Sequence, residues 1–201
     1  MAISGRRARR AALALLTGVA LAALVGGTTV AAPVDAPPER VRSVTDVWMR
    51  DVTADVGLQP HWGNAIWASP DVRVCRTPVP CDVSTTAVVG ATNYIKVQLR
   101  NPGPYGSGTD SGVLRFYRTD PGGGLVWPTA WTLVTSVTVV VPPGVTTVLV
   151  PWVGVPGPGH FELLAVWDSV DDPLPLLGSD IATNVRYSNN IAWRGVDSVI
   201  V

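Results

Sequence analysis

The two histidines, His61 and His160, are the only imidazole groups of the chain. An imidazole acts as a base or a metal ligand when partner side chains lie at suitable spacing. These two occur in PHWGN and GPGHFELL, without a glutamate or second histidine at metal-binding spacing. The stretch TDSG at 109–112 is similar to a serine-protease nucleophile loop, but no second glycine follows Ser111. We therefore predict no catalytic residue, no cofactor and no histidine-bound metal.

Closely spaced carboxylates are the second chemical candidate. Asp168, Asp171 and Asp172 lie in WDSVDDP, at the end of an expected strand. Calcium accepts six to eight oxygen ligands in loose geometry, so these three residues form a weak calcium candidate. The alternative is a solvated acidic turn, which we favour because the glycine and the distal glutamate of a dedicated calcium loop are missing. The acidic residues between 46 and 71 repeat the pattern more weakly.

The only two cysteines, Cys75 and Cys81, occur in CRTPVPC. In an exported chain, oxidising conditions favour a bridge between such a pair. Two thiolates without a nearby histidine would leave a zinc site half built. We predict a local disulfide that fixes a turn and contributes roughly 2 kcal/mol.

Eight tryptophans are many for a chain of 201 residues. Exposed indoles on one sheet face can stack against sugar rings, as in carbohydrate-binding modules. We expect Trp67, Trp152 and Trp193 to pack in the core or at strand ends. Trp127 and Trp131, in GLVWPTAW, are the expected exposed pair and the candidate ligand-binding residues.

These residues must be positioned by β-strands. In Asn93 to Arg100, apolar and polar residues alternate, and Gly112 to Arg118 repeats the pattern, so we expect two neighbouring antiparallel strands. Thr132 to Val141 and Val145 to Val150 are β-branched runs separated by Pro-Pro-Gly, which favours strand, turn, strand. Further strands are expected at Val47 to Asp51, Val72 to Arg76, Phe161 to Asp168 and Ile191 to Ile200.

Seven to eight short strands with Gly and Pro between them predict an all-β fold, an immunoglobulin-like antiparallel β-sandwich. Crossover helices of a parallel sheet would not fit the short connections. No repeat of 20 to 50 residues is visible, which argues against a propeller or solenoid. Closure into a barrel is the remaining alternative.

The first 32 residues combine a basic cluster, an apolar run from Ala11 to Val25 and small residues, the pattern of a signal peptide. The apolar run is short for a membrane span. Residues 33–41 read as a flexible proline-rich arm, and residues 42–201 as one domain. We expect a secreted protein that is not embedded in a membrane once processed.

The charge balance excludes one class of partner. The chain has 15 basic and 15 acidic residues, and removal of the four leader arginines leaves 11 against 15. This mildly acidic domain is not expected to bind nucleic acid.

Several segments, taken in order, resemble a CARDB-like, immunoglobulin-fold module of exported bacterial proteins. They are DVWMRDVTADVG, IWASPDVRV, TNYIKVQLRNPG, VLRFYRTD with GLVWPTAW, VPWVGVPGPGHFELLAVWD and NNIAWRGV. The resemblance covers residues 46–199 and implies a sandwich that serves as an accessory or adhesion unit, with no catalytic residues. The chain departs from that pattern at Glu162 and Trp167, where relatives tend to carry a cysteine and a basic residue.

We therefore expect a non-enzymatic binding or adhesion module whose partner is a protein or a cell-surface glycan. One alternative is a carbohydrate-binding module that uses exposed tryptophans. Another is a small secreted hydrolase with an unrecognised site.

Overall fold

The computed structural model describes residues 44–175 and 177–201. The predicted signal peptide at 1–32 and the arm at 33–41 lie outside this part. Within it, no helix is long and apolar enough to cross a membrane.

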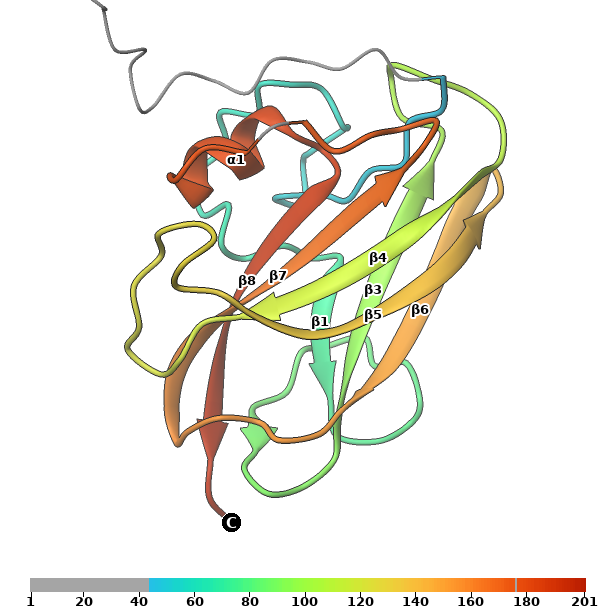
Figure 1. The fold of residues 1–201 in the computed structure, drawn as a ribbon. Helices are drawn as coiled ribbons and strands as arrows, with labels where there is room; N and C mark the ends of the chain where they lie inside the picture. Colours follow the sequence, from blue (N-terminus) through green and yellow to red (C-terminus); the bar gives the residue numbers. More distant parts are fainter. Residues whose placement is uncertain (1–43, 176) are drawn as a thin grey trace, which may run out of the picture. The chain divides into compact units, whose positions relative to one another are not determined.

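The strands form two sheets (Figure 1). The three-stranded sheet, sheet A, has the order β1-β3-β6, and the five-stranded sheet, sheet B, has the order β2-β8-β7-β4-β5. All pairs are antiparallel except the two-residue pairing of β2 with β8. The predicted all-β, immunoglobulin-like sandwich is confirmed. The strands are β1 (Val72–Cys75), β2 (Ala87–Val88), β3 (Asn93–Asn101), β4 (Asp110–Arg118), β5 (Thr132–Val141), β6 (Gly144–Trp152), β7 (Gly159–Ser169) and β8 (Ile191–Val199).

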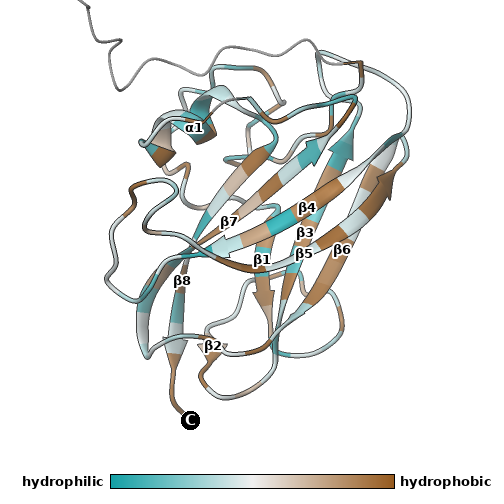
Figure 2. Ribbon diagram, viewed as in Figure 1, coloured by the Kyte–Doolittle hydropathy of each residue, from teal (hydrophilic) through white to brown (hydrophobic). Residues whose placement is uncertain are grey.

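The main core lies between the two sheets. Successive side chains of a strand point to opposite faces, and brown and teal segments accordingly alternate along β4 in Figure 2. Ile95, Val97 and Leu99 of β3 are fully buried and belong to the same cluster as the inward-facing side chains of sheet B. Trp152 of β6 packs edge-to-face on Phe161 of β7, with ring centroids 5.5 Å apart. Burial of this cluster, rings and aliphatic side chains together, is the main source of stability between the layers.

A second cluster covers part of the outer face of sheet B. The short helix α1 (Ile181–Tyr187) places Ile181 and Val185 against Leu164 and Val166 of β7. Asp180 caps the helix, because its carboxylate accepts hydrogen bonds from the first free backbone N–H groups. Sheet B is therefore buried on both faces over this stretch, which explains why β7 shows an almost continuous apolar run.

Two strand predictions were wrong. The strands β3 and β4 are not neighbours, since β3 belongs to sheet A and β4 to sheet B. Alternation shows that each strand has one buried face; it does not show whether the two strands pair or face each other. The glycine-rich loop between them carries the chain from one sheet to the other.

The segment from Val47 to Asp51 is not a strand. It makes an isolated bridge between Trp48 and Arg100, and then Met49 donates its N–H to the carbonyl of Asn189. The segment is held by two different parts of the chain, so no continuous ladder forms.

The predicted disulfide is confirmed. Cys75, the last residue of β1, is bonded to Cys81, with their Cα atoms 5.7 Å apart. The side chains of Arg73 and Lys96 both donate to the carbonyl oxygen of Cys81, at 3.2 and 2.8 Å. The bridge and these two cations fix the turn against sheet A.

Candidate functional site

The strands β7 and β8 bring a group of polar and aromatic side chains together on the outer face of sheet B. In their antiparallel register His160 lies opposite Asp197, and Glu162 opposite Gly195. The neighbouring residue Phe161 points into the main core. Because side chains alternate, His160 and Glu162 point to the outer face.

His160 lies between two carboxylates. Its Nδ1 is 2.9 Å from Asp197 Oδ1, and its Nε2 is 3.2 Å from Glu162 Oε1. The hydrogen bond to Asp197 raises the pKa of His160, and the nearby Glu162 adds to this effect. The positively charged imidazole is therefore favoured. In the protonated form both ring nitrogens donate hydrogen bonds, one to each carboxylate.

Glu162 is the most enclosed member of the group, with 13% of its side chain exposed. Burial raises the pKa of Glu162, while the indole of Trp193, which donates to Glu162 Oε2 at 2.7 Å, opposes the rise. The side chains of His160 and Asp197 are more open, at 62% and 69% exposed. One fixed carboxylate is thus flanked by two accessible polar groups.

Gly195 keeps this part of the surface open. A Cβ atom there would lie 3.1 Å from His160 Cε1 and 3.3 Å from Glu162 Oε2. Any other side chain would crowd both groups and cover the backbone between them. The glycine is therefore matched to the close spacing of the two side chains on β7.

An exposed indole borders the polar group. Trp67 is 52% exposed, and its ring lies 6.3 Å from the ring of the buried Trp193 at an interplanar angle of 61°. The backbone holds it in place: Gly195 donates to the carbonyl of Trp67, and Ser69 donates to the carbonyl of Trp193. We call Trp67, His160, Glu162, Trp193 and Asp197 the Trp67 surface.

The Trp67 surface was not predicted from the sequence. Trp67 was expected to be packed, and it is half exposed. His160 lies just before the strand predicted from Phe161, but its partners Glu162 and Asp197 come from two strands whose register the sequence does not reveal. An alternating H-x-E at the start of a strand was the one available signal, since it places both side chains on one face.

Trp127 and Trp131, which were predicted to be exposed, lie outside the Trp67 surface and are not exposed. Trp131 is 8% exposed and belongs to the cluster beneath α1, and Trp127 is half-buried with its ring 5.1 Å from that of Tyr117. The loop from 119 to 131 folds back on sheet B, so its indoles fill space between loop and sheet. Ligand binding by Trp127 and Trp131 stays an untested prediction, and Trp131 has little surface to offer.

The calcium candidate is not assembled. Asp168 forms an ion pair with Arg115, with Oδ2 and Nη1 3.0 Å apart. Asp172 points inward and accepts a hydrogen bond from Asn190, while Asp171 is exposed. In the part of the chain that the structure describes, no group of three histidine, cysteine, aspartate or glutamate side chains is placed to hold a metal ion.

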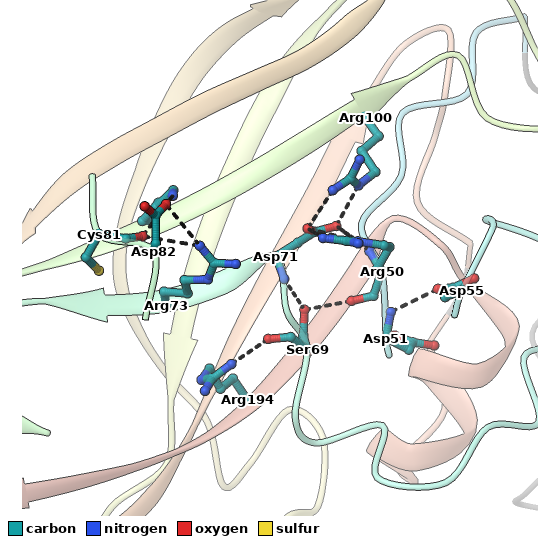
Figure 3. Close-up of polar contacts among 11 residues, drawn as sticks. Arg50, Asp51, Asp55, Ser69, Asp71, Arg73, Cys81, Asp82, Arg100 and Arg194 are labelled. Carbon is teal, nitrogen blue, oxygen red and sulfur yellow. Dashed lines mark hydrogen bonds and ion pairs between the residues drawn. The ribbon is translucent and has the colours of Figure 1, made fainter. Parts of the chain in front are cut away.

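The acidic residues before β1 form a buried network and not a surface cluster. The side chain of Asp71 is fully buried and receives hydrogen bonds from Arg50 and Arg100, as Figure 3 shows. Burial alone would raise the pKa of Asp71, but the two guanidinium groups outweigh it and lower the pKa. This trio, which we call the Asp71 network, ties the 44–69 segment to β3 and is a structural element.

A second buried acidic pair lies close by. Asp55 accepts the backbone N–H groups of Asp51 and Gly57 at 2.9 and 2.8 Å. Asp51 Oδ1 is buried without a hydrogen-bond partner. Burial raises the pKa of Asp51 well above its usual value, and the adjacent Asp55 raises it further. Asp51 is therefore held in the fold at an energetic cost when it is ionised.

His61, the other histidine, lies beside this pair. Its Nδ1 is 3.7 Å from Asp55 Oδ1, and its backbone N–H donates to the carbonyl of Arg186. The adjacent Trp62 is 68% exposed, with Tyr187 edge-on and Arg186 over its ring. His61 thus anchors the loop to the end of α1 and is separate from the Trp67 surface.

The chain is similar in fold to a CARDB domain. No protein-family model matches the sequence, and no curated protein matches it. Among solved structures, the CARDB domain of the PF1109 protein from Pyrococcus furiosus matches with a TM-score of 0.38 and 20% identity, over 65% of this chain and 89% of that one.

Unrelated proteins match at a similar level. A β-glucosidase from Listeria innocua has a TM-score of 0.35 and 12% identity, over 65% of this chain and 16% of the enzyme. Scorpion hemocyanin has a TM-score of 0.38 and 8% identity, over 55% of this chain and 30% of that one. At such low identities and TM-scores, none of these matches says what the chain binds or does.

Proposed function

We propose that the chain is a non-catalytic, extracellular binding module that contacts glycans through the Trp67 surface. The observation that carries the proposal is the half-exposed indole of Trp67, held against Trp193 and next to Glu162, His160 and Asp197. The ring has an open face, and the polar groups beside it are fixed before any ligand arrives.

The chemistry of a sugar fits this combination. The C–H face of a pyranose ring is apolar and packs on an indole, while its hydroxyl groups donate to carboxylates. Here the accessible carboxylate of Asp197 would accept from hydroxyls directly, and His160 would hold that carboxylate in place. Pre-organisation by the hydrogen bonds among these side chains reduces the entropic cost of binding.

Hydrolysis is disfavoured by the same geometry. The two ring nitrogens of His160 are both taken by carboxylates, and its raised pKa favours the protonated form, which does not act as a base. The hydrolase alternative would be revived by turnover that disappears in His160→Ala or His61→Ala.

The test is a binding screen of the exported chain against soluble polysaccharides and cell-wall fractions. We expect saturable binding that Trp67→Ala reduces at least tenfold. Trp62→Ala is the matched control, since Trp62 is more exposed than Trp67, at 68% against 52%, but lies near α1, and this variant should bind as the wild type does. Equal loss in both variants, or no glycan signal with one secreted protein captured instead, would contradict the proposal.

A further inference from the structure

One long part of the chain has no acidic residue, lysine or arginine. Between Asp120 and Glu162 there is no aspartate, glutamate, lysine or arginine. This part contains β5 and β6, which are the edge strands of sheet B and sheet A. The chain passes directly from the end of β5 to the start of β6, so both edges lie on the same flank of the sandwich (Figure 1).

From Thr135 to Val141, β5 lacks the features that normally protect an edge strand. Its ten residues include no charged residue, proline or glycine, and eight of them are β-branched. The register of β5 with β4 is regular from Thr135 to Val141. The one register shift between these two strands lies outside this stretch, between Phe116 and Tyr117 of β4. Its outer side chains are open, with Val140 60% exposed. Natural edge strands usually carry a lysine, a proline or a bulge against unwanted pairing.

The opposite flank is protected. The edge strand β1 is four residues long, and Ser84 and Thr85 hydrogen-bond to its residue Val74. The edge of β8 is covered by residues 67–69 at one part and by β2 at another. Among the described residues, the backbone of β5 from Thr132 to Val140 has hydrogen bonds to β4 only, so its outer edge has no comparable cover.

We propose that β5 pairs with β5 of a second copy of this chain, antiparallel and about a twofold axis at Thr138. A twofold axis normal to the sheet keeps the inner face of both copies on the same side, so core-facing residues meet core-facing residues. The resulting cross-strand pairs are Thr138 with Thr138, Val137 with Val139, Ser136 with Val140, and Thr135 with Val141.

A second copy is the occupant that the observations favour. Antiparallel pairing of an edge with itself is isologous, and no pair in this register brings two charges together. The paired stretch from Thr135 to Val141 is about 24 Å long, and with a sandwich side about 15 Å thick the two copies would bury about 700 Å² in total. This is less than a standard interface buries and predicts a weak, concentration-dependent dimer.

The test measures the mass of the exported chain by light scattering after gel filtration. We expect a concentration-dependent dimer in the wild type. Thr138→Lys and Thr138→Glu each place like charges opposite one another at the axis, so each should be monomeric at concentrations where the wild type is dimeric. An equimolar mixture of the two should restore the dimer, because lysine then faces glutamate. Simple destabilisation of the fold would not be rescued by mixing.

Ser111→Lys is the matched control. Ser111 is an exposed residue of the same sheet, one strand away on β4, and is paired with Val140. This variant should remain dimeric. A wild type that stays monomeric up to about 1 mM, where an interface of this size should form, would overturn the proposal. So would a mixture that fails to restore the dimer, or a Ser111→Lys variant that dissociates.

Discussion

Replacement of Asp71 by asparagine tests the role of the buried ion network most directly. The side chain of Asp71 is fully buried, whereas those of Arg50 and Arg100 keep 21% and 22% of their surface exposed. Asp71 accepts from Nε and Nη2 of both arginines and from the backbone N–H of Arg50. Asparagine has the same shape, but it would turn one acceptor into a donor that faces two guanidinium groups.

The cost can be worked from these contacts. Removal of one partner from a buried ion pair costs about 3 to 5 kcal/mol, because an uncompensated charge stays buried. Here water can still reach part of both arginines, so the lower end applies, and Asp71→Asn should lower the free energy of unfolding by about 3 kcal/mol. Partial hydration of the arginines prevents a larger loss.

The loss should depend on pH with a definite sign. The pKa of Asp71 is lowered in the folded state, while an unfolded aspartate titrates near about 3.9. The carboxylate therefore contributes stability that is fully present above that value and is lost as pH falls through the folded pKa. The difference between wild type and Asp71→Asn should be large at neutral pH and should shrink in acid.

Urea unfolding followed by tryptophan fluorescence at neutral and acid pH is the assay. Asp82→Asn is the matched control, because Asp82 is fully exposed and lies 3.9 and 3.8 Å from Arg73 and Lys96. It should have no measurable effect. The reasoning is refuted if Asp71→Asn costs less than about 1 kcal/mol at neutral pH, or costs as much in acid as at neutral pH.

Three further predictions follow from the structure. Asp51→Asn should stabilise the fold at neutral pH by roughly 1 to 3 kcal/mol, which is the cost of a buried unpaired group. The gain in stability should vanish below the usual aspartate pKa, because wild-type Asp51 is then protonated in both the folded and the unfolded state. Thermal unfolding measured across pH tests this. Cys75→Ser with Cys81→Ser should cost about 2 kcal/mol in urea unfolding, and an unchanged midpoint would refute it. His160 should titrate above its ordinary pKa by NMR and move back toward it in Asp197→Asn, a shift that would be absent if the two side chains did not interact.

Much of the fold was predictable because it depends on local patterns. The alternation in β3 and the β-branched runs of β5 and β6 gave these strands nearly to the residue. The short spacing of Cys75 and Cys81 indicated their bridge. Each of these signals lies within about ten residues of sequence, where pattern and propensity are informative.

What could not be predicted depends on partners distant in sequence. The sequence suggests an exposed acid at Asp71, but the pairing of β1 with β3 places Arg100 beside it. The exposure of Trp67 and the burial of Trp131 were reversed for the same reason. An indole is buried or open according to which loop folds over which sheet face, and composition around a tryptophan does not encode that.

The two proposed surfaces occupy opposite ends of sheet B and are therefore compatible. Trp67 and Trp193 lie at β8, and the dimer contact lies at β5, with β7 and β4 between them. At about 4.8 Å per strand, β8 and β5 are about 14 Å apart, and a twofold axis beyond β5 roughly doubles the separation between copies. A dimer would then present two Trp67 surfaces on one continuous sheet. A polymeric glycan with repeated units would bind such a pair more tightly than a single surface, even when each single contact is weak. The reason is that the second contact forms at a high effective concentration.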